Sequence, residues 1–256
     1  MKIATWNVNS ITARLPHVLQ WLAQAQPDVL CIQESKCPDA RFPVAALAEI
    51  GYDSVVYGQP TYNGVAFLTK HAAVDVWRGL PGDDTDTQAR LIAATINGVR
   101  LINVYVPNGA SVGSDKYMYK LAWLQRLRRF LDENCERAAP VLLCGDFNVA
   151  PEDRDVHDPK AWAGSVMVSK TERKALQLVK DWGFTDIFRR YYAESGYYSW
   201  WDYRSGGFPL NRGLRIDHIW VTPSLGAHST AVAIDRVPRG WEKPSDHTPV
   251  IAEFDF

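Results

Sequence analysis

The sequence lacks the patterns that mark several common classes of protein. It contains no Gly-x-Gly-x-x-Gly and no P-loop motif, which weighs against an enzyme that uses a nucleotide cofactor. No stretch approaches the ~18 apolar residues of a membrane span, and the opening Met-Lys-Ile-Ala-Thr-Trp-Asn is too short an apolar run for a signal peptide. We therefore expect a soluble protein that has no membrane attachment and lies in the cytoplasm.

Cysteine is scarce, and neither sign of charge is in clear excess. The four cysteines form no Cys-x-x-Cys pair, and Cys31 and Cys144 lie within apolar runs. Buried reduced thiols are therefore favoured over a disulfide framework or a zinc site. With 28 Lys and Arg against 29 Asp and Glu, the formal net charge is -1, so the chain carries no global basic signal for nucleic acid. A local basic face stays open.

Linkers, low-complexity runs and blocks of like charge are also absent from the 256 residues. The hydrophobic share of 46% and the charged share of 22% are ordinary for a globular protein, and the length is near the upper limit for one continuous core. We expect a single domain over residues 1–256 that is present as a monomer.

What is present is a series of strand-like and helix-like segments. Asn97-Gly98 between two β-like runs is a strong hairpin signal, so residues 99–106 should pair antiparallel with residues 91–96. The pattern therefore favours an α/β fold of two packed mixed sheets flanked by helices over a doubly wound sheet. Strands are predicted over residues 3–6, 65–69, 90–96, 99–106, 141–144, 214–222 and 250–254, a further buried run spans residues 27–34 and ends in Glu34, and helices are predicted over 15–26, 45–50, 116–133 and 169–182.

Three of these helices carry more specific expectations. Pro16 fits the first turn of the first helix, where its missing N–H costs nothing. Ser169-x-x-Glu172 forms a capping box that opens the last helix. The 116–133 helix has a leucine stripe on one face, and we expect its cations on a solvated face: Lys116, Lys120, Arg126, Arg128 and Arg129.

The stretch from residue 139 to residue 151 holds the first candidate for chemistry. The apolar run 141–144 is short enough for a strand buried on both faces, and it leads into Gly145, Asp146, Phe147 and Asn148. A carboxylate and an amide two residues apart on an extended chain point to the same side. Asp146 can accept a proton or bind a hard metal, and Asn148 can donate to developing negative charge. An Asx-type turn is the alternative reading of the same residues.

The same kind of polar residue recurs at the ends of other apolar strands. Repeated use of this pattern suggests a cleft at one pole of the sheets, lined by oxygen ligands and one imidazole. Such oxygens suit Mg²⁺ or Mn²⁺ and not zinc. The residues in such positions are Asn7, Glu34, Tyr105, Asp146, Asn148, Asp217, Asp246 and His247.

These ingredients fit the hydrolysis of a phosphodiester, in which a metal polarises the phosphate and a base activates water. His247 needs a carboxylate partner to fix its tautomer. Asp217, on another strand, is a better candidate than the adjacent Asp246, whose side chain points elsewhere on an extended chain.

Five motifs that include these residues are spread along nearly the whole chain: Trp6-Asn7, Gln33-Glu34, Gly145-Asp146-Phe147-Asn148, Arg215-Ile216-Asp217-His218 and Ser245-Asp246-His247. In order and spacing they resemble the exonuclease III family of apurinic/apyrimidinic endonucleases, within the larger deoxyribonuclease I-like superfamily. Asp-x-Asn and Ser-Asp-His recur across that superfamily, which includes lipid and inositol phosphatases. Three segments look particular to the exonuclease III branch: Trp200-Trp201-Asp202-Tyr203-Arg204, Asn211-Arg212-Gly213-Leu214-Arg215 and Glu242-Lys243-Pro244.

The resemblance implies a four-layered α/β sandwich and Mg²⁺-dependent DNA repair chemistry. The expected substrate is double-stranded DNA, cut 5′ to abasic sites and trimmed at blocked 3′ ends, with 3′–5′ exonuclease activity in addition. The resemblance assigns metal binding to Glu34, with Asn7 and Asp246 nearby. Asp146, Asn148 and His247 would also belong to the metal site, which would take Mg²⁺ with Mn²⁺ as a substitute.

The resemblance also gives each catalytic position a role. Asp146 would orient or deprotonate the water, and Asn148 would stabilise the transition state. Tyr105 would lie at the phosphate or the leaving group, and Asp217 and His247 would act as a pair.

Substrate contacts are implied at further positions. Trp200 would line the pocket for the base-free sugar, while Arg90, Asn211 and Arg215 would contact substrate or brace the site. The 153–168 loop should border the DNA. Because the net charge is -1, phosphate contacts must come from cations concentrated near the cleft, and the candidates are Arg90, Arg204, Arg212, Arg215, Arg239 and Lys243.

Two other functions compete with the nuclease. A phosphoesterase acting on lipid or inositol phosphates would share the superfamily motifs, but the Trp-Trp-Asp-Tyr-Arg and Asn-Arg-Gly-Leu-Arg segments argue against it. A non-catalytic DNA-binding protein on the same fold would not need to retain every one of the polar positions.

Overall fold

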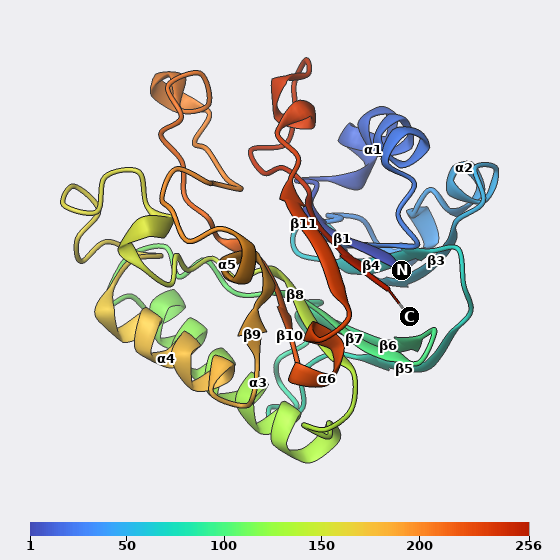
Figure 1. Cartoon of the computed structure of the whole chain (residues 1–256), viewed down its shortest axis with the longest axis horizontal. Helices are drawn as coiled ribbons and strands as arrows, with labels where there is room; N and C mark the ends of the chain where they lie inside the picture. Colours follow the sequence, from blue (N-terminus) through green and yellow to red (C-terminus); the bar gives the residue numbers. More distant parts are fainter. Residues whose placement is uncertain (256) are drawn as a thin grey trace.

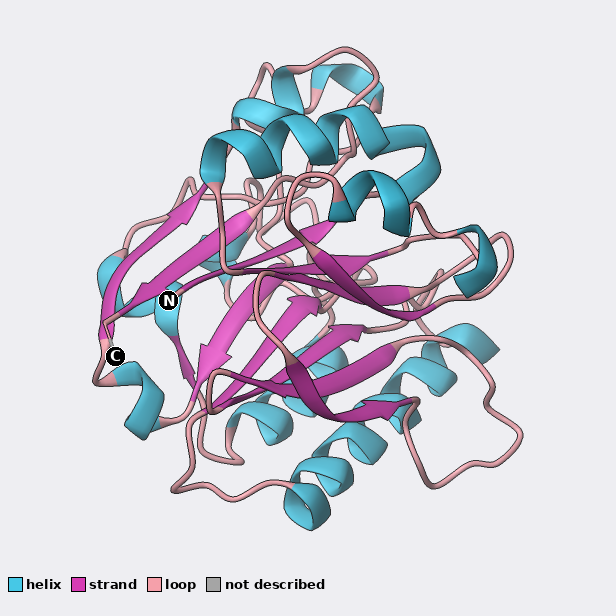
Figure 2. Ribbon diagram, turned by 90° about the vertical axis from the view of Figure 1, so that its right-hand side faces the viewer, coloured by secondary structure: helices cyan, strands magenta, loops and turns pink. Residues whose placement is uncertain are grey.

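The computed structural model describes residues 1–255 and consists of four layers. Two six-stranded β-sheets pack face to face, and helices cover the outer side of each sheet (Figure 2). This arrangement confirms the predicted α/β sandwich of two packed mixed sheets.

The first sheet contains the N-terminal and the C-terminal strands of the chain. Its β1 and β2 run parallel, and every other neighbouring pair is antiparallel. The strands in spatial order are β11 (Ser229–Ile234), β12 (Val250–Phe254), β1 (Lys2–Asn7), β2 (Val29–Gln33), β4 (Val65–Thr69) and β3 (Asp53–Tyr57).

The second sheet has the same number of strands and likewise a single parallel pair, β7 with β8. The predicted hairpin is confirmed, since Ile96 pairs with Val99 across the Asn97-Gly98 turn. The strands in spatial order are β5 (Ala73–Arg78), β6 (Leu91–Ile96), β7 (Val99–Tyr105), β8 (Val141–Asp146), β10 (Asp217–Val221) and β9 (Thr185–Asp186).

Helices α1 to α4 lie outside the sheets (Figure 1), whereas α5 and α6 contribute side chains to the layer between them. The first two pack on the outer face of the first sheet, and the two longest of the later ones, α3 and α4, pack on the outer face of the second. None of the helices within residues 1–255 has the length and apolar character needed to cross a membrane. The α-helices are α1 (Ile11–Ala25), α2 (Val44–Ala48), α3 (Asp115–Asn134), α4 (Lys170–Lys180), α5 (Ile187–Tyr191) and α6 (Pro223–Gly226).

The core is divided by the sheets into an inner layer and two outer ones. On β8, Leu142 and Cys144 face the other sheet, whereas Val141 and Leu143 face α3. The strand is therefore buried on both faces, as its continuous apolar run predicts. All four cysteines are free thiols, and three of them, Cys135 being the exception, are buried.

The structure departs from the predicted elements in two respects. Helix α1 begins at Ile11 and not at residue 15, because Ser10 caps it by accepting a hydrogen bond from the Ala13 amide, so Pro16 lies inside the helix. Strands β3, β5, β9 and β11 were not predicted. All four lie at sheet edges, and β3, β5 and β11 consist mainly of exposed and partly buried residues, so their sequences resemble those of inner strands less closely.

Candidate active site

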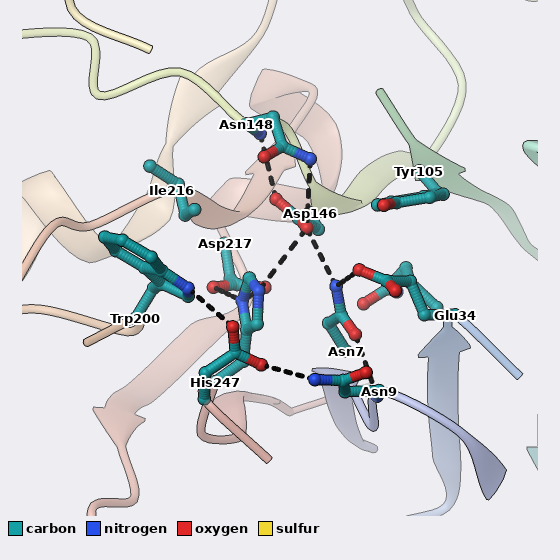
Figure 3. A network of polar contacts seen from close by, with 12 residues as sticks. Asn7, Asn9, Glu34, Tyr105, Asp146, Asn148, Trp200, Ile216, Asp217 and His247 are labelled. Carbon is teal, nitrogen blue, oxygen red and sulfur yellow. Dashed lines mark hydrogen bonds and ion pairs between the residues drawn. The ribbon is translucent and has the colours of Figure 1, made fainter. Parts of the chain in front are cut away.

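The predicted polar residues converge at one pole of the sandwich, where strands of both sheets end (Figure 3). Asn7 is the last residue of β1 and Glu34 follows β2, while Tyr105 and Asp146 end β7 and β8. Each of these pairs of strands is parallel, so both members of a pair end at the same edge. Asp217 begins β10 and is directly opposite Asp146 in the antiparallel register.

Gly145 allows β8 to reach this pole beside β7. A Cβ built on Gly145 would lie 1.9 Å from the carbonyl oxygen of Val104, and its φ of 139° favours glycine. Directly after the strand, Asn148 takes a φ of 49°, a left-handed conformation that asparagine tolerates better than most residues. The chain thereby turns Asn148 back over the end of its own strand.

Asp217 and His247 form the predicted pair. Nδ1 of His247 lies 2.8 Å from one carboxylate oxygen of Asp217 and 3.1 Å from the other. Ser199 donates a further hydrogen bond of 2.7 Å to Asp217, which is fully buried. Burial alone would lower the pKa of His247, but the carboxylates of Asp217 and Asp146 outweigh it and raise this pKa to about 10.

Asp146 lies on the other side of the imidazole. One of its carboxylate oxygens is 3.6 Å from Nε2 of His247 and accepts a hydrogen bond of 2.9 Å from the Asn7 amide. The backbone and side-chain amides of Asn148 donate to the same carboxylate over 2.9 and 3.1 Å. Burial raises the pKa of Asp146 to about 7, although the charge of His247 opposes the rise.

Glu34, Asp146 and His247 are the residues that could hold a metal ion. One ligand atom of each lies within 4.8 Å of the others, and Nδ2 of Asn7 bridges the two carboxylates, donating over 2.8 Å to Glu34. A buried and a partly buried carboxylate with an amide beside them are the donor set expected for a hard cation, so the residues fit Mg²⁺. Lys36, 2.7 Å from Glu34, supplies a positive charge to the same carboxylate.

Asp246 does not belong to that converging group. Its carboxylate accepts hydrogen bonds from the Trp200 indole at 2.9 Å and from Asn9 at 3.0 Å. Burial would raise the pKa of Asp246, but the charge of His247 and these two hydrogen bonds lower it. The structure thus places Asp246 where it fixes Trp200 and the 200–203 segment.

Tyr105 borders the site on the side of Glu34. Burial, together with the nearby Glu34 and Asp146 carboxylates, raises its pKa, so the phenol keeps its proton and can donate it in a hydrogen bond. The guanidinium of Arg90 lies over its ring at 4.7 Å. Glu34, Arg90 and Tyr105 line one end of a pocket of about 450 Å³, with Asn108 and Lys116.

Trp200 and Trp201 differ in exposure. Trp201 is fully buried, whereas Trp200 is half-buried and meets the ring of Trp162, from the 153–168 loop, at 6.4 Å. Leu214 and Ile216 belong to the same apolar cluster. These two residues were not predicted from the sequence, although their place in the Asn-Arg-Gly-Leu-Arg-Ile-Asp run next to Asp217 could have indicated them.

The cations predicted to contact phosphate differ in exposure and in their partners. Arg212 and Arg204 are exposed, but Arg204 is paired with Asp202, and the exposed Lys243 lies 3.7 Å from Glu242. Arg239 is buried between the rings of Tyr203 and Phe208. Asn211 is half-buried and accepts from the Trp201 indole over 3.2 Å.

Arg215 is not available for substrate in this structure. It is 1% exposed and makes ion pairs of 2.7 Å with Asp155 and with Asp186. It also donates to Nδ1 of His218, whose pKa is lowered to about 3 by burial and by the Arg215 charge. Of the two roles considered, contact or bracing, the structure supports bracing, because Arg215 ties the 153–168 loop to the start of β10.

Lys120 corrects the prediction of a solvated helix face. Its ammonium is fully buried in an ion pair with Glu172, and it donates to the carbonyl oxygens of Asn108 and Asn148 over 3.0 and 2.8 Å. Asn108 in turn donates to the side chain of Asn148 over 3.0 Å. Lys120 lies in phase with the stripe of Leu124, Leu127 and Leu131, and that spacing could have indicated its burial.

Comparisons with known proteins agree with this geometry. A model of the endonuclease/exonuclease/phosphatase family matches residues 4–247. Exodeoxyribonuclease III of Haemophilus influenzae is 37% identical over 267 residues, covering 99% of this chain and 100% of that protein.

Solved structures give the same picture. An AP endonuclease from Archaeoglobus fulgidus superposes with a TM-score of 0.97 at 41% identity, over 100% of both chains. A 3′ phosphatase from Neisseria, bound to a product DNA hairpin, superposes with a TM-score of 0.96 at 45% identity, again over 100% of both chains.

Proposed function

This chain belongs to the exonuclease III branch of the endonuclease/exonuclease/phosphatase family, and from that premise we propose how its site acts. Membership makes the protein a hydrolase of the nuclease type. We propose that it cleaves double-stranded DNA 5′ to abasic sites, removes blocking groups from 3′ ends, and degrades duplex DNA as a 3′–5′ exonuclease. The cytoplasmic location and the monomeric state expected from the sequence stay predictions.

The observation that carries the chemistry is the pair formed by Asp146 and His247. The Asp146 carboxyl has a pKa of about 7 and lies 3.6 Å from the His247 imidazole, whose pKa is about 10. Near neutral pH, Asp146 can therefore lose its proton while His247 keeps its own. Asp146 in its ionised form is a general base whose strength matches the working pH. His247 in its protonated form is a fixed positive charge and a donor.

Mg²⁺ is the proposed cofactor, with Mn²⁺ as a substitute. Glu34 and Asp146 would hold it, with the oxygen of Asn7 beside them, and the bound ion would polarise the phosphate. Nδ1 of His247 is paired with Asp217 and its Nε2 lies 3.6 Å from Asp146, so His247 is proposed as a hydrogen-bonding neighbour of the metal and not as a ligand. Asp246 and Asn148 are likewise assigned to positioning and to hydrogen bonding.

Each residue of the site has its own role in the reaction. Asp146 takes a proton from the attacking water as the new bond to phosphorus forms and the bond to the leaving oxygen breaks. His247, held by Asp217, donates to a phosphate oxygen, and Asn148 donates to the charge that develops on the phosphate. Tyr105, whose raised pKa keeps it protonated, donates to the phosphate or to the leaving oxygen.

Substrate selection would use the surface around Trp200. Its half-buried ring, with Leu214 and Ile216 behind it, offers an apolar surface for a sugar that carries no base. A normal nucleotide would place its base where the Trp200 ring lies. Arg212 and Arg90 would contact the phosphates of the DNA strand.

The test measures the turnover of three substrates by the purified protein, each with and without Mg²⁺. They are a duplex with one abasic site, a nicked duplex with a 3′ phosphate, and an inositol phosphate. We expect Mg²⁺-dependent turnover of both DNA substrates and none of the inositol phosphate. Turnover of the inositol phosphate in preference to DNA would favour a phosphoesterase, and DNA binding without turnover would favour a non-catalytic protein.

A further inference from the structure

A small polar network interrupts the apolar layer between the two sheets. Thr5, Gln33 and Asn103 are all fully buried, among the apolar side chains that the sheets share. Nε2 of Gln33 donates to Oγ1 of Thr5 over 2.8 Å and to Oδ1 of Asn103 over 2.6 Å. Buried polar groups are costly unless they are paired, so a network at this depth needs a reason.

The hydrogen bonds of Asn103 cross from one sheet to the other. Asn103 belongs to β7, in the second sheet, and its Nδ2 donates over 2.9 and 3.0 Å to the backbone carbonyls of Ile32 and Ala66, in the first sheet. Ile32 and Ala66 are opposite each other in the register of β2 and β4. Apolar contact between sheets has no preferred direction, whereas these hydrogen bonds fix one position of β7 relative to β2 and β4.

The network lies directly beneath the active site. Thr5 is two residues before Asn7 on β1, Asn103 is two residues before Tyr105 on β7, and Gln33 is next to Glu34. Residues two apart on a strand share a face, so Thr5 and Asn103 lie one layer below Asn7 and Tyr105. The proposed metal donors are divided in the same way, since Glu34 follows a strand of the first sheet and Asp146 ends a strand of the second.

We infer that Gln33 and Asn103 are positioning residues for the metal site. They hold the two sheets in the one alignment that brings the Glu34 carboxylate within reach of Asp146. Without them the sheets keep their apolar packing but lose the directional link, and the metal donors move apart. This inference rests on the proposed metal site and adds the residues that assemble it.

The cost of the network supports this assignment over a contribution to stability alone. Oε1 of Gln33 is buried with no hydrogen-bond partner within residues 1–255. A leucine pair of similar shape would remove that unpaired atom, and replacing both partners of a buried hydrogen bond by apolar groups is often nearly neutral for stability. A network that served stability alone would not need to retain this unpaired oxygen.

The test uses two variants and one matched control. Asn103→Leu removes the link between the sheets, and the double variant Gln33→Leu/Asn103→Leu removes it while leaving fewer polar groups unpaired. The control is Thr222→Val. Thr222 is also fully buried and bridges Val141 N and Ala139 O over 3.0 and 2.8 Å, but it lies at the opposite end of β8 and β10.

The measurements are Mn²⁺ binding by calorimetry in the absence of DNA, the Mg²⁺ concentration that half-saturates cleavage, and the thermal midpoint of each variant. We expect Asn103→Leu and the double variant to bind Mn²⁺ about 10- to 100-fold more weakly, the range found when outer partners of metal ligands are removed. The half-saturating Mg²⁺ concentration should rise by the same factor. Thr222→Val should bind Mn²⁺ as the wild type does, even at an equal or larger loss of thermal stability.

Wild-type Mn²⁺ affinity in the double variant would overturn the inference. If the single variant Asn103→Leu does not fold, the double variant alone decides. Equal weakening in Thr222→Val would also overturn it, because loss of stability would then explain the effect. A wild-type chain that binds no Mn²⁺ and cleaves without metal would refute the proposed metal site itself, which is a separate result.

Discussion

The arrangement of Asp146, His247 and Asp217 makes the pH dependence of the reaction specific. Asp146 must lose its proton to act as the base, so kcat/KM should rise with pH through about 7. His247 must keep its proton, so the rate should fall as pH passes about 10. A bound cation favours the ionised carboxyl, and raising the Mg²⁺ concentration should therefore move the rising limb to lower pH. A rising limb whose position on the pH axis does not change with Mg²⁺ concentration would contradict a role for Asp146 beside the metal.

The short contact between Asp217 and His247 implies that the two residues act as a unit. The double variant Asp217→Ala/His247→Ala should therefore be scarcely slower than the slower single variant, because the effects of coupled catalytic residues are not additive. Single-turnover rates of the four proteins give the comparison. Losses that multiply would mean that the two residues work independently, and lost thermal stability with an unchanged rate would assign the pair to the fold.

At the scale of elements, the ion pair between Lys120 on α3 and Glu172 on α4 supports the loop that carries Asn148. Lys120→Met should destabilise the protein by about 3–5 kcal/mol, because it leaves the Glu172 carboxylate buried without its partner. Lys120→Met/Glu172→Met should recover part of that loss. Denaturant unfolding at equilibrium measures both.

Arg128→Met supplies the control on the same helix. Its ion pair with Asp132 is partly exposed, so the change should cost only about 0–1 kcal/mol. Equal costs for Lys120→Met and Arg128→Met would show that the buried pair does not contribute in the way the geometry indicates.

The elements also show how far the sequence can be interpreted. The inner strands β8 and β12, the hairpin of β6 and β7 and the capping box at Ser169 were predicted, because each leaves a local signal in the chain. Edge strands leave a weaker local signal in the sequence. The pairing of Asp217 with His247 was predicted from residue types. The ion pairs of Lys120 and Arg215 were not predicted, because their acidic partners lie far away in sequence.

At the scale of the whole molecule, a net charge of -1 must still allow binding to a polyanion. Binding should weaken as salt rises, with a log–log slope of about -0.9 for each phosphate neutralised. Arg212→Ala should make the slope shallower without changing which lesion is preferred, and Trp200→Ala should do the reverse. Binding titrations at several salt concentrations, on abasic and intact duplexes, measure both quantities. A Trp200→Ala protein that kept the wild-type ratio between the two duplexes would refute this division of roles.

Metal-assisted hydrolysis with Asp146 at its centre is tested most directly by one measurement. It is the single-turnover cleavage of an abasic duplex by the wild type and by Asp146→Asn, in excess chelator and after Mg²⁺ is restored. We predict no cleavage with chelator, full recovery with Mg²⁺, and a loss of at least ~10²-fold in Asp146→Asn, the scale for removing a positioned acid or base. Undiminished cleavage in excess chelator, or a wild-type rate in Asp146→Asn, would contradict it.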